Sequence, residues 1–146
     1  MLGAMTEKIR VLFLCTNNAA RSQMAEALLR HAAGDRFEVV SAGLEPTEVH
    51  PLTRQVLDER GVSTAGLRAK GVGQFLGKVK VDYAIGVCDP AELNCPRVFP
   101  FALNALQWPF EDPTAAPAGA AKLEAFRRVR DAIEARLTEW RLKLGK

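Results

Sequence analysis

Long apolar runs are absent from this sequence. The longest uninterrupted one, Val11 to Cys15, has five residues, whereas about 18 are needed to span a bilayer. The sequence therefore predicts no transmembrane helix. The segment before this run also lacks the apolar core of a signal peptide, so we expect a cytoplasmic protein that does not associate with membranes.

An extreme composition is absent as well. Hydrophobic residues make up 48% of the chain and charged residues 25%, close to the average of globular proteins. That balance excludes a disordered chain and a fibrous coil. The length of 146 residues suits one hydrophobic core, and we expect residues 1–146 to form a single domain and a monomer.

The chain has little excess charge of either sign. Its net charge is +3, and residues 122–146 hold eight basic and four acidic side chains. A basic stripe with interleaved aromatic residues is missing, so the pattern does not favour nucleic acid binding. The solvated face of a C-terminal helix accounts for these charges.

Cysteine is scarce, with Cys15, Cys88 and Cys95 as its three copies. An odd number argues against the disulfide framework of a secreted protein, and in a reducing cytosol such residues are more often buried, metal-binding or catalytic. Zinc is not favoured, because Cys88 and Cys95 do not form a C-x2-C pair and His31 and His50 are remote in sequence. We expect no metal site.

What the chain does contain is an alternation of strand and helix patterns. Apolar and β-branched runs predict strands at 9–14, 37–42, 82–87 and 105–108. Apolar spacing and end signals predict helices at 21–34, 51–60 and 123–144, with a short helical turn near 74–76. This order predicts an α/β fold with a doubly wound, four-stranded parallel sheet flanked by helices. Sites in such folds lie at the carboxyl ends of the strands.

Cys15 and Arg21 form a C-x5-R motif between a predicted strand and a predicted helix. Backbone N–H groups of such a loop can converge on one oxyanion, and the helix N-terminus adds positive partial charge. Arg21 can bind two oxygens of that anion. The same field favours a Cys15 thiolate as nucleophile, and Ser22 can donate to its sulfur. We expect the anion to be bound by Thr16, Asn17, Asn18, Ala19, Ala20, Arg21 and Ser22.

The segment CTNNAARSQMAEALLR resembles the phosphate-binding loop and first helix of low-molecular-weight tyrosine phosphatases and the related arsenate reductases. Those enzymes carry a general acid in an Asp-Pro pair late in the chain, and Asp112-Pro113 matches it. The resemblance implies that Asp112 protonates the leaving oxygen. Asp89-Pro90 is a second Asp-Pro pair, which lies beside Cys88 and suits another role.

Cys88 and Cys95 match the C-x6-C spacing of thioredoxin-coupled arsenate reductases. The resemblance implies that Cys15 attacks arsenate and that Cys88 then forms a disulfide with Cys15 as arsenite leaves. It also implies that Cys95 attacks Cys88 and that thioredoxin reduces the resulting Cys88–Cys95 disulfide. No metal or organic cofactor is implied.

Some arsenate reductases bind potassium near residues that match Asn18, Glu26 and Ser41. The further acidic ligand of that site falls within residues 69–72, where this chain has no acidic residue, so we expect no potassium site. Asn17 and Ala19 stand where the family commonly has Gly or His and Ser. These departures bear on the turnover rate more than on the reaction class.

Three alternatives stay open at this point. Cys15, Arg21 and Asp112 would also serve a low-molecular-weight tyrosine phosphatase, in which water attacks a phosphocysteine, and we expect weak side activity on aryl phosphates. A small thiol such as mycothiol or bacillithiol could replace thioredoxin. A non-catalytic sensor of anions or redox state could use the same loop.

Overall fold

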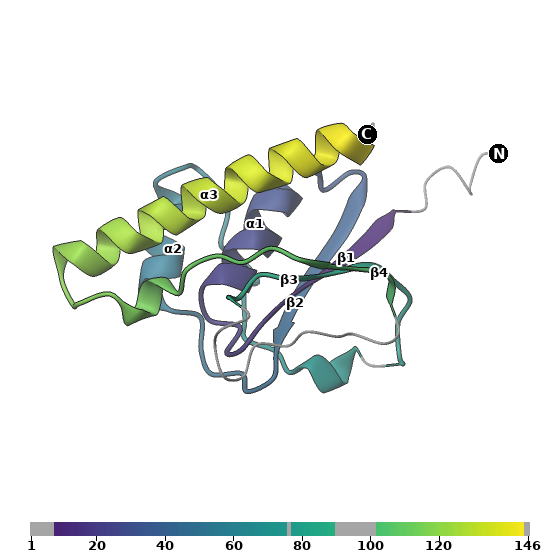
Figure 1. The fold of residues 1–146 in the computed structure, drawn as a ribbon, viewed down its shortest axis with the longest axis horizontal. Helices are drawn as coiled ribbons and strands as arrows, with labels where there is room; N and C mark the ends of the chain where they lie inside the picture. Colours follow the sequence, from purple (N-terminus) through teal and green to yellow (C-terminus); the bar gives the residue numbers. More distant parts are fainter. Residues whose placement is uncertain (1–7, 76, 90–101, 145–146) are drawn as a thin grey trace.

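The computed structural model describes residues 8–75, 77–89 and 102–144, and its elements alternate as the sequence pattern predicts (Figure 1). In chain order they are β1 (Ile9–Cys15), α1 (Arg21–Ala33), β2 (Phe37–Gly43), α2 (Pro51–Asp58), η2 (Val72–Gln74), β3 (Val81–Gly86), β4 (Ala102–Gln107), η3 (Pro113–Ala115) and α3 (Ala120–Leu144), where η marks a short 3₁₀ helix. Cys95 lies outside the described residues.

Four strands of the described chain form one parallel sheet in the order β2-β1-β3-β4. The predicted parallel α/β fold is thereby confirmed. β1 lies inside the sheet, where Cys15 pairs with Gly43 of β2 and Leu14 with Gly86 of β3. Because the strands are parallel, their carboxyl ends meet at one edge, and this edge carries the loop after β1.

The two faces of the sheet are covered differently. α1, α2 and α3 lie on one face, and η2 lies on the other (Figure 1). Side chains of β1 alternate between them, so Phe13 joins the helix-covered core while Leu12 and Leu14 join a smaller cluster on the opposite face. Burial on both faces explains why β1 is a continuous apolar run.

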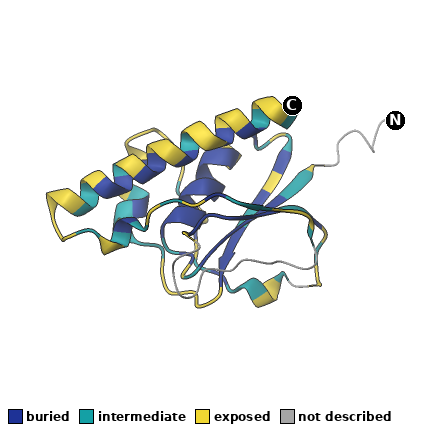
Figure 2. Ribbon diagram, in the orientation of Figure 1, coloured by how far each residue is buried: buried dark blue, intermediate teal, exposed yellow. Residues whose placement is uncertain are grey.

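α3 follows its predicted apolar stripe closely. Phe126, Ile133 and Trp140 are buried, and the dark buried positions recur along the side of the helix that faces the sheet (Figure 2). Its exposed residues form the charged outer face. None of the described helices is long and apolar enough to cross a membrane.

Two short elements differ from the sequence prediction. Residues 105–108 are predicted as a strand, whereas β4 runs from Ala102 to Gln107. Its first residues do not show an alternating apolar pattern, because β4 pairs only with β3 among the described strands and none of its residues is fully buried. The turn predicted near 74–76 lies slightly earlier, at Val72–Gln74.

Candidate active site

The loop between β1 and α1 places Cys15 and Arg21 at its two ends. Cys15 is the last residue of β1 and Arg21 the first of α1, and both are buried. Asn18 between them has a positive φ of 54°, a conformation that Asn tolerates better than most residues. The resulting turn brings the Asn18 backbone N–H within 3.3 Å of the Cys15 sulfur.

The end of β2 leaves room for this loop. A Cβ atom at Gly43 would lie 2.6 Å from the Thr16 carbonyl oxygen and 2.8 Å from the Asn18 nitrogen, closer than van der Waals contact allows. Only glycine therefore fits beside the loop at this position. The segment after β2 then holds the loop through backbone bonds from Glu45 to Thr16, from Thr47 to Asn17 and from His50 to Ala19.

A pocket opens over the loop and joins residues that are far apart in the sequence. It is lined by Cys15, Asn17, Ala19, Ala20, Arg21, Asp112 and Thr114. The structure thus brings Asp112 to the Cys15 loop. Thr16, Asn18 and Ser22 of the predicted anion-binding set do not line the pocket, and the latter two are fully buried.

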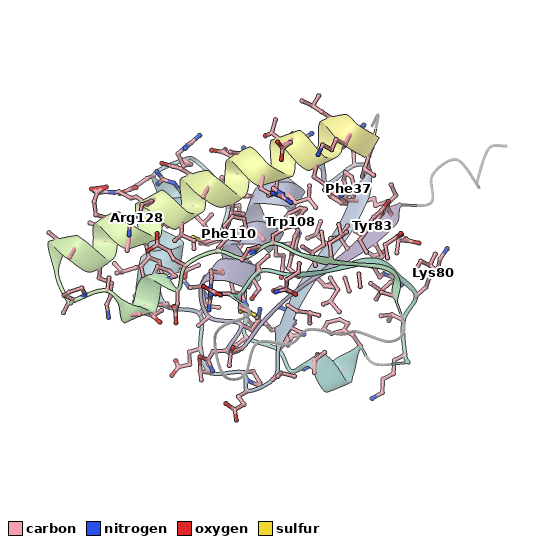
Figure 3. All side chains as sticks on the ribbon, in the orientation of Figure 1. Phe37, Lys80, Tyr83, Trp108, Phe110 and Arg128 are labelled. Carbon is pink, nitrogen blue, oxygen red and sulfur yellow. The ribbon has the colours of Figure 1, made fainter. Side chains whose placement is uncertain are left out.

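Arg21 connects the loop to the segment that carries Asp112. Its Nη1 donates to the Phe110 carbonyl at 3.0 Å, and its Nη2 lies 3.9 Å from Asp112 Oδ2. The other oxygen, Asp112 Oδ1, accepts from the backbone N–H and the hydroxyl of Thr114 at 2.9 and 2.7 Å. Asp112 Oδ1 therefore caps η3, and Asp112 Oδ2 faces Arg21. Figure 3 shows Trp108 and Phe110 on this segment, between the sheet and α3.

A chain of hydrogen bonds runs behind the Cys15 sulfur. Cys15 Sγ lies 2.8 Å from Ser22 Oγ. Asn18 Nδ2 donates to Ser22 Oγ at 2.7 Å and to Ser41 Oγ at 2.9 Å. The Ser41 hydroxyl in turn donates to Glu26 Oε1. Residues of the loop, α1 and β2 are therefore coupled in one buried network.

The contacts of Asn18 determine which group donates and which accepts in this series of hydrogen bonds. The Lys70 backbone N–H can only donate, and it donates to Asn18 Oδ1 at 2.8 Å, so the amide nitrogen of Asn18 must face the two serines. Each serine oxygen then accepts from Asn18. The Ser22 proton is then left for the Cys15 sulfur, so Ser22 donates to that sulfur.

The end of this hydrogen-bond network that lies farthest along it from Cys15 is charged and buried. Glu26 is 4% exposed and pairs with Arg30 on one side and with Lys70 Nζ, at 3.5 Å, on the other. Lys70 is 7% exposed, and its Nζ also donates to the Arg68 carbonyl at 2.7 Å. Burial lowers the pKa of Lys70 from its ordinary value, and the Glu26 carboxylate opposes that shift.

Cys88 comes off the sheet beside the end of β1. Val87, the residue before it, donates its backbone N–H to the Leu14 carbonyl at 2.9 Å. Cys88 is fully buried and disulfide-bonded, whereas Cys15 is a free thiol. The predicted proximity of the two strand ends is therefore observed, while the predicted role of Cys95 falls outside the described part of the chain.

Sequence reasoning missed the contacts of three residues: Thr114, Lys70 and His50. His50 lies in the loop before α2, and its ring caps α2 by accepting the Leu52 N–H at Nδ1, 3.1 Å away. Burial is the main cause that lowers the pKa of His50, Lys122 lowers it further, and Asp112 opposes both. Pro51 at the first helical position was the available signal for this cap. No comparable signal marks Lys70.

Metal ligands do not gather at this site. Within residues 8–75, 77–89 and 102–144, no group of three or more His, Cys, Asp and Glu side chains could hold a metal ion.

The chain is similar to known proteins along nearly its whole length. The profile of the family described as low molecular weight phosphotyrosine protein phosphatase matches residues 10–146. An arsenate reductase of Brevibacillus brevis is 35% identical over 136 residues, which cover 93% of this chain and 96% of that protein.

Solved structures agree with the sequence matches. A structure described as an arsenate reductase in the phosphate binding state has a TM-score of 0.78 at 29% identity, covering 92% of this chain and 98% of its own. A thioredoxin-dependent arsenate reductase of Corynebacterium glutamicum has a TM-score of 0.65 at 31% identity, covering 94% of this chain and 64% of its own.

Proposed function

Because the chain belongs to the low molecular weight phosphotyrosine protein phosphatase family, we propose that it is an arsenate reductase with Cys15 as its nucleophile. The loop from Thr16 to Ser22 binds the oxyanion, and Arg21 binds two of its oxygens. The pocket over Cys15 and Arg21 and the relatives described as arsenate reductases support this assignment.

The first chemical step forms a sulfur–arsenic bond. The Cys15 thiolate attacks arsenic, one arsenic–oxygen bond breaks, and Asp112 gives its proton so that the oxygen leaves as water. The donors to Cys15, from Ser22 and the Asn18 backbone, favour the thiolate before attack. The Asp112 oxygen on the Arg21 side supplies the proton.

The second step reduces arsenic by two electrons. The Cys88 thiolate attacks the Cys15 sulfur, the sulfur–arsenic bond breaks, and its electron pair stays on arsenic, which leaves as arsenite. The Cys95 thiolate then attacks Cys88 and releases the Cys15 thiolate. Thioredoxin, whose dithiol is oxidised in exchange, reduces the Cys88–Cys95 disulfide. The thioredoxin-dependent relative of Corynebacterium glutamicum supports this choice of reductant. We propose that the reaction takes place in the cytoplasm.

The observation that carries the proposal is the position and state of Cys88. It follows β3 at the edge where β1 ends in Cys15, and it is disulfide-bonded while Cys15 is free. A second cysteine at this edge is what attack on the Cys15–arsenic adduct requires. A phosphatase has no use for a second cysteine at this edge.

The pocket lining argues in the same direction. A tyrosine phosphatase needs aromatic or other broad apolar side chains to hold the ring of its substrate. The described residues that line this pocket, Cys15, Asn17, Ala19, Ala20, Arg21, Asp112 and Thr114, include no aromatic residue. A small oxyanion suits them better than an aryl phosphate, which we expect to be a poor substrate.

The test is arsenate-dependent NADPH oxidation in the presence of thioredoxin and thioredoxin reductase, compared with hydrolysis of p-nitrophenyl phosphate. We expect sustained NADPH oxidation and only weak hydrolysis. Rapid hydrolysis without arsenite release would identify a phosphatase. Turnover with a small thiol but not with thioredoxin would identify the small thiol as the reductant. Absence of both arsenate reduction and phosphate ester hydrolysis would favour a sensor.

Cys95→Ser tests the relay. The variant should release about one arsenite per enzyme and then stop as a Cys15–Cys88 disulfide, because no thiol remains to attack Cys88. Cys88→Ser is the matched variant and should release no arsenite. Mass spectrometry of the trapped disulfide together with arsenite counting gives the readout. Normal thioredoxin-driven turnover of Cys95→Ser contradicts the three-cysteine relay.

A further inference from the structure

We propose that the Lys70 ammonium is a built-in cation, which positions the hydrogen-bond chain behind Cys15 in place of a bound monovalent metal ion. The inference names a positioning residue for the proposed arsenate reduction and, in that respect, rests on the proposed function. Lys70 does not line the pocket over Cys15, so its role is to orient other groups.

The ammonium lies where buried oxygen atoms converge. Lys70 Nζ is 3.5 Å from Glu26 Oε1 and 2.7 Å from the Arg68 carbonyl oxygen. The same Glu26 oxygen accepts the hydroxyl of Ser41. One carboxylate oxygen therefore joins the ammonium directly to the chain that ends at Cys15.

A potassium ion does not fit beside this group. The potassium ligands implied by the family resemblance include Glu26 and Ser41, but Glu26 already faces two cationic side chains, Lys70 and Arg30. A third positive charge among them would be repelled at short range in a site that water screens poorly. The carboxylate and carbonyl oxygens that a hard cation prefers are already used by Lys70 Nζ.

The backbone of Lys70 acts on the same network. Its N–H donates to Asn18 Oδ1 at 2.8 Å, and its carbonyl accepts the Gly43 N–H at 2.9 Å. The side chain thus secures the Glu26 end of the chain while the backbone orients Asn18. Arg30, the other partner of Glu26, has a side chain that is 46% exposed, so Lys70 supplies the buried positive charge.

This position predicts two properties. The protein as it stands should be indifferent to potassium, because its own ammonium fills the site. Truncation of Lys70 should open a small space lined by Glu26 and Arg68 oxygens, and a monovalent cation from solution should then enter it. A neutral side chain of similar length should keep that space closed.

Lys70→Ala and Lys70→Met test these properties, with Lys80→Ala as the control. Lys80 is 64% exposed and lies at the opposite end of the sheet (Figure 3). The readout is alkylation of reduced Cys15 by iodoacetamide, and its protection by inorganic phosphate. Each variant is measured in choline, potassium and ammonium chloride at a constant ionic strength of about 0.1 M. Arsenate turnover is measured in parallel.

We expect wild type and Lys80→Ala to bind phosphate equally in all three salts. In choline chloride, Lys70→Ala should bind phosphate about 10–100-fold more weakly, and potassium or ammonium should restore most of the loss. Lys70→Met should show the loss without the rescue. This readout needs no reduction of arsenate, so the pattern would stand even if arsenite were never released.

Other results overturn the inference. Potassium dependence in the wild type would show that Lys70 does not replace the ion. Wild-type phosphate binding by Lys70→Met in choline chloride would show that the ammonium is dispensable. A loss in Lys70→Ala that no small cation restores would assign Lys70 a packing role. If Lys70→Ala does not fold, the wild-type and Lys70→Met measurements still decide.

Discussion

At the scale of single residues, two side chains orient the groups of the site. Asn18 fixes the donor direction toward Cys15 because Lys70 occupies its carbonyl oxygen. Arg21 spans from the loop to Phe110 and Asp112. Both are buried, so their orientation is set by the surrounding protein rather than by solvent. Preorganised donors of this kind stabilise charge without reorganisation during the reaction.

Arg21→Lys keeps the positive charge but loses the planar pair of donors. We expect kcat/KM for arsenate to fall by roughly 100-fold while the circular dichroism spectrum stays unchanged. Arg60→Lys is the control and should behave as wild type, because Arg60 lies in the turn after α2 and forms an exposed ion pair with Asp131 of α3. Near-normal kinetics of Arg21→Lys would show that Arg21 does not bind the substrate.

Asp112→Asn removes the proposed proton donor and keeps an oxygen that can accept the Thr114 N–H. The first chemical step, measured as single-turnover arsenite release, should slow by about 10²–10⁴-fold. Phosphate should still protect Cys15 from alkylation. Asp89→Asn, in the other Asp-Pro pair, should mainly alter the later disulfide steps. The reverse pattern would assign the acid role to Asp89.

At the scale of elements, the site depends on how closely β2 approaches the loop after β1. Cys15 and Gly43 are paired in the sheet, and the loop turns back over the end of β2. His50 then caps α2 while its backbone N–H holds the Ala19 carbonyl. The loop is therefore held by strand pairing on one side and a helix start on the other.

Gly43→Ala tests this close approach. The added Cβ would lie 2.6 Å from the Thr16 oxygen, so the loop must shift, at a cost of about 1–3 kcal/mol in the free energy of unfolding. Displacement of the Cys15 loop should also lower kcat/KM about 100-fold. Gly73→Ala is the control, because its Cβ meets nothing within 4 Å. Unchanged stability and kinetics for Gly43→Ala would show that the loop after β1 can move aside without cost.

At the scale of the whole molecule, α3 closes the fold over α1 and α2 (Figure 1). Glu59, which ends α2, accepts from Arg127 at 2.6 Å and from Arg130 at 2.7 Å, both on α3. Hydrogen bonds from Arg127 and then from Arg130 lower the pKa of Glu59 from 4.5 to about 2. This cluster links the end of α2 to α3.

The Glu59 cluster predicts a component of acid instability. A carboxylate with a depressed pKa in the folded state stabilises the fold above pH 4.5, and this contribution is lost as the pH falls from 4.5 toward 2. Glu59→Gln should lower Tm at neutral pH, and its Tm should approach that of wild type near pH 2. Added salt should shrink the difference, because the group is exposed.

Thermal melts between pH 2 and 7 measure the effect. Glu139→Gln, whose carboxylate lies 3.9 Å from Arg136 in an exposed pair, is the control and should track wild type at every pH. A Tm difference for Glu59→Gln that is independent of pH would mean that the side chain contributes through packing rather than through its charge.

The local patterns of the sequence determined the elements and the reactive motif. Apolar spacing in α3 and the continuous run of β1 reflect burial of neighbouring residues on the same element. The C-x5-R loop needs only the junction between one strand and one helix. For these features the interacting residues are close in sequence, so their pattern is visible without the fold.

The tertiary structure alone decided how distant segments meet. Glu26, Ser41 and Lys70 come from three separate segments, and only the sheet order and register bring their polar atoms together. The start of β4 was not predicted for a related reason. Backbone hydrogen bonds to β3 specify it, and backbone hydrogen bonds do not depend on the side-chain pattern. A lysine in an irregular stretch looks like a solvated charge until the fold buries it beside a carboxylate.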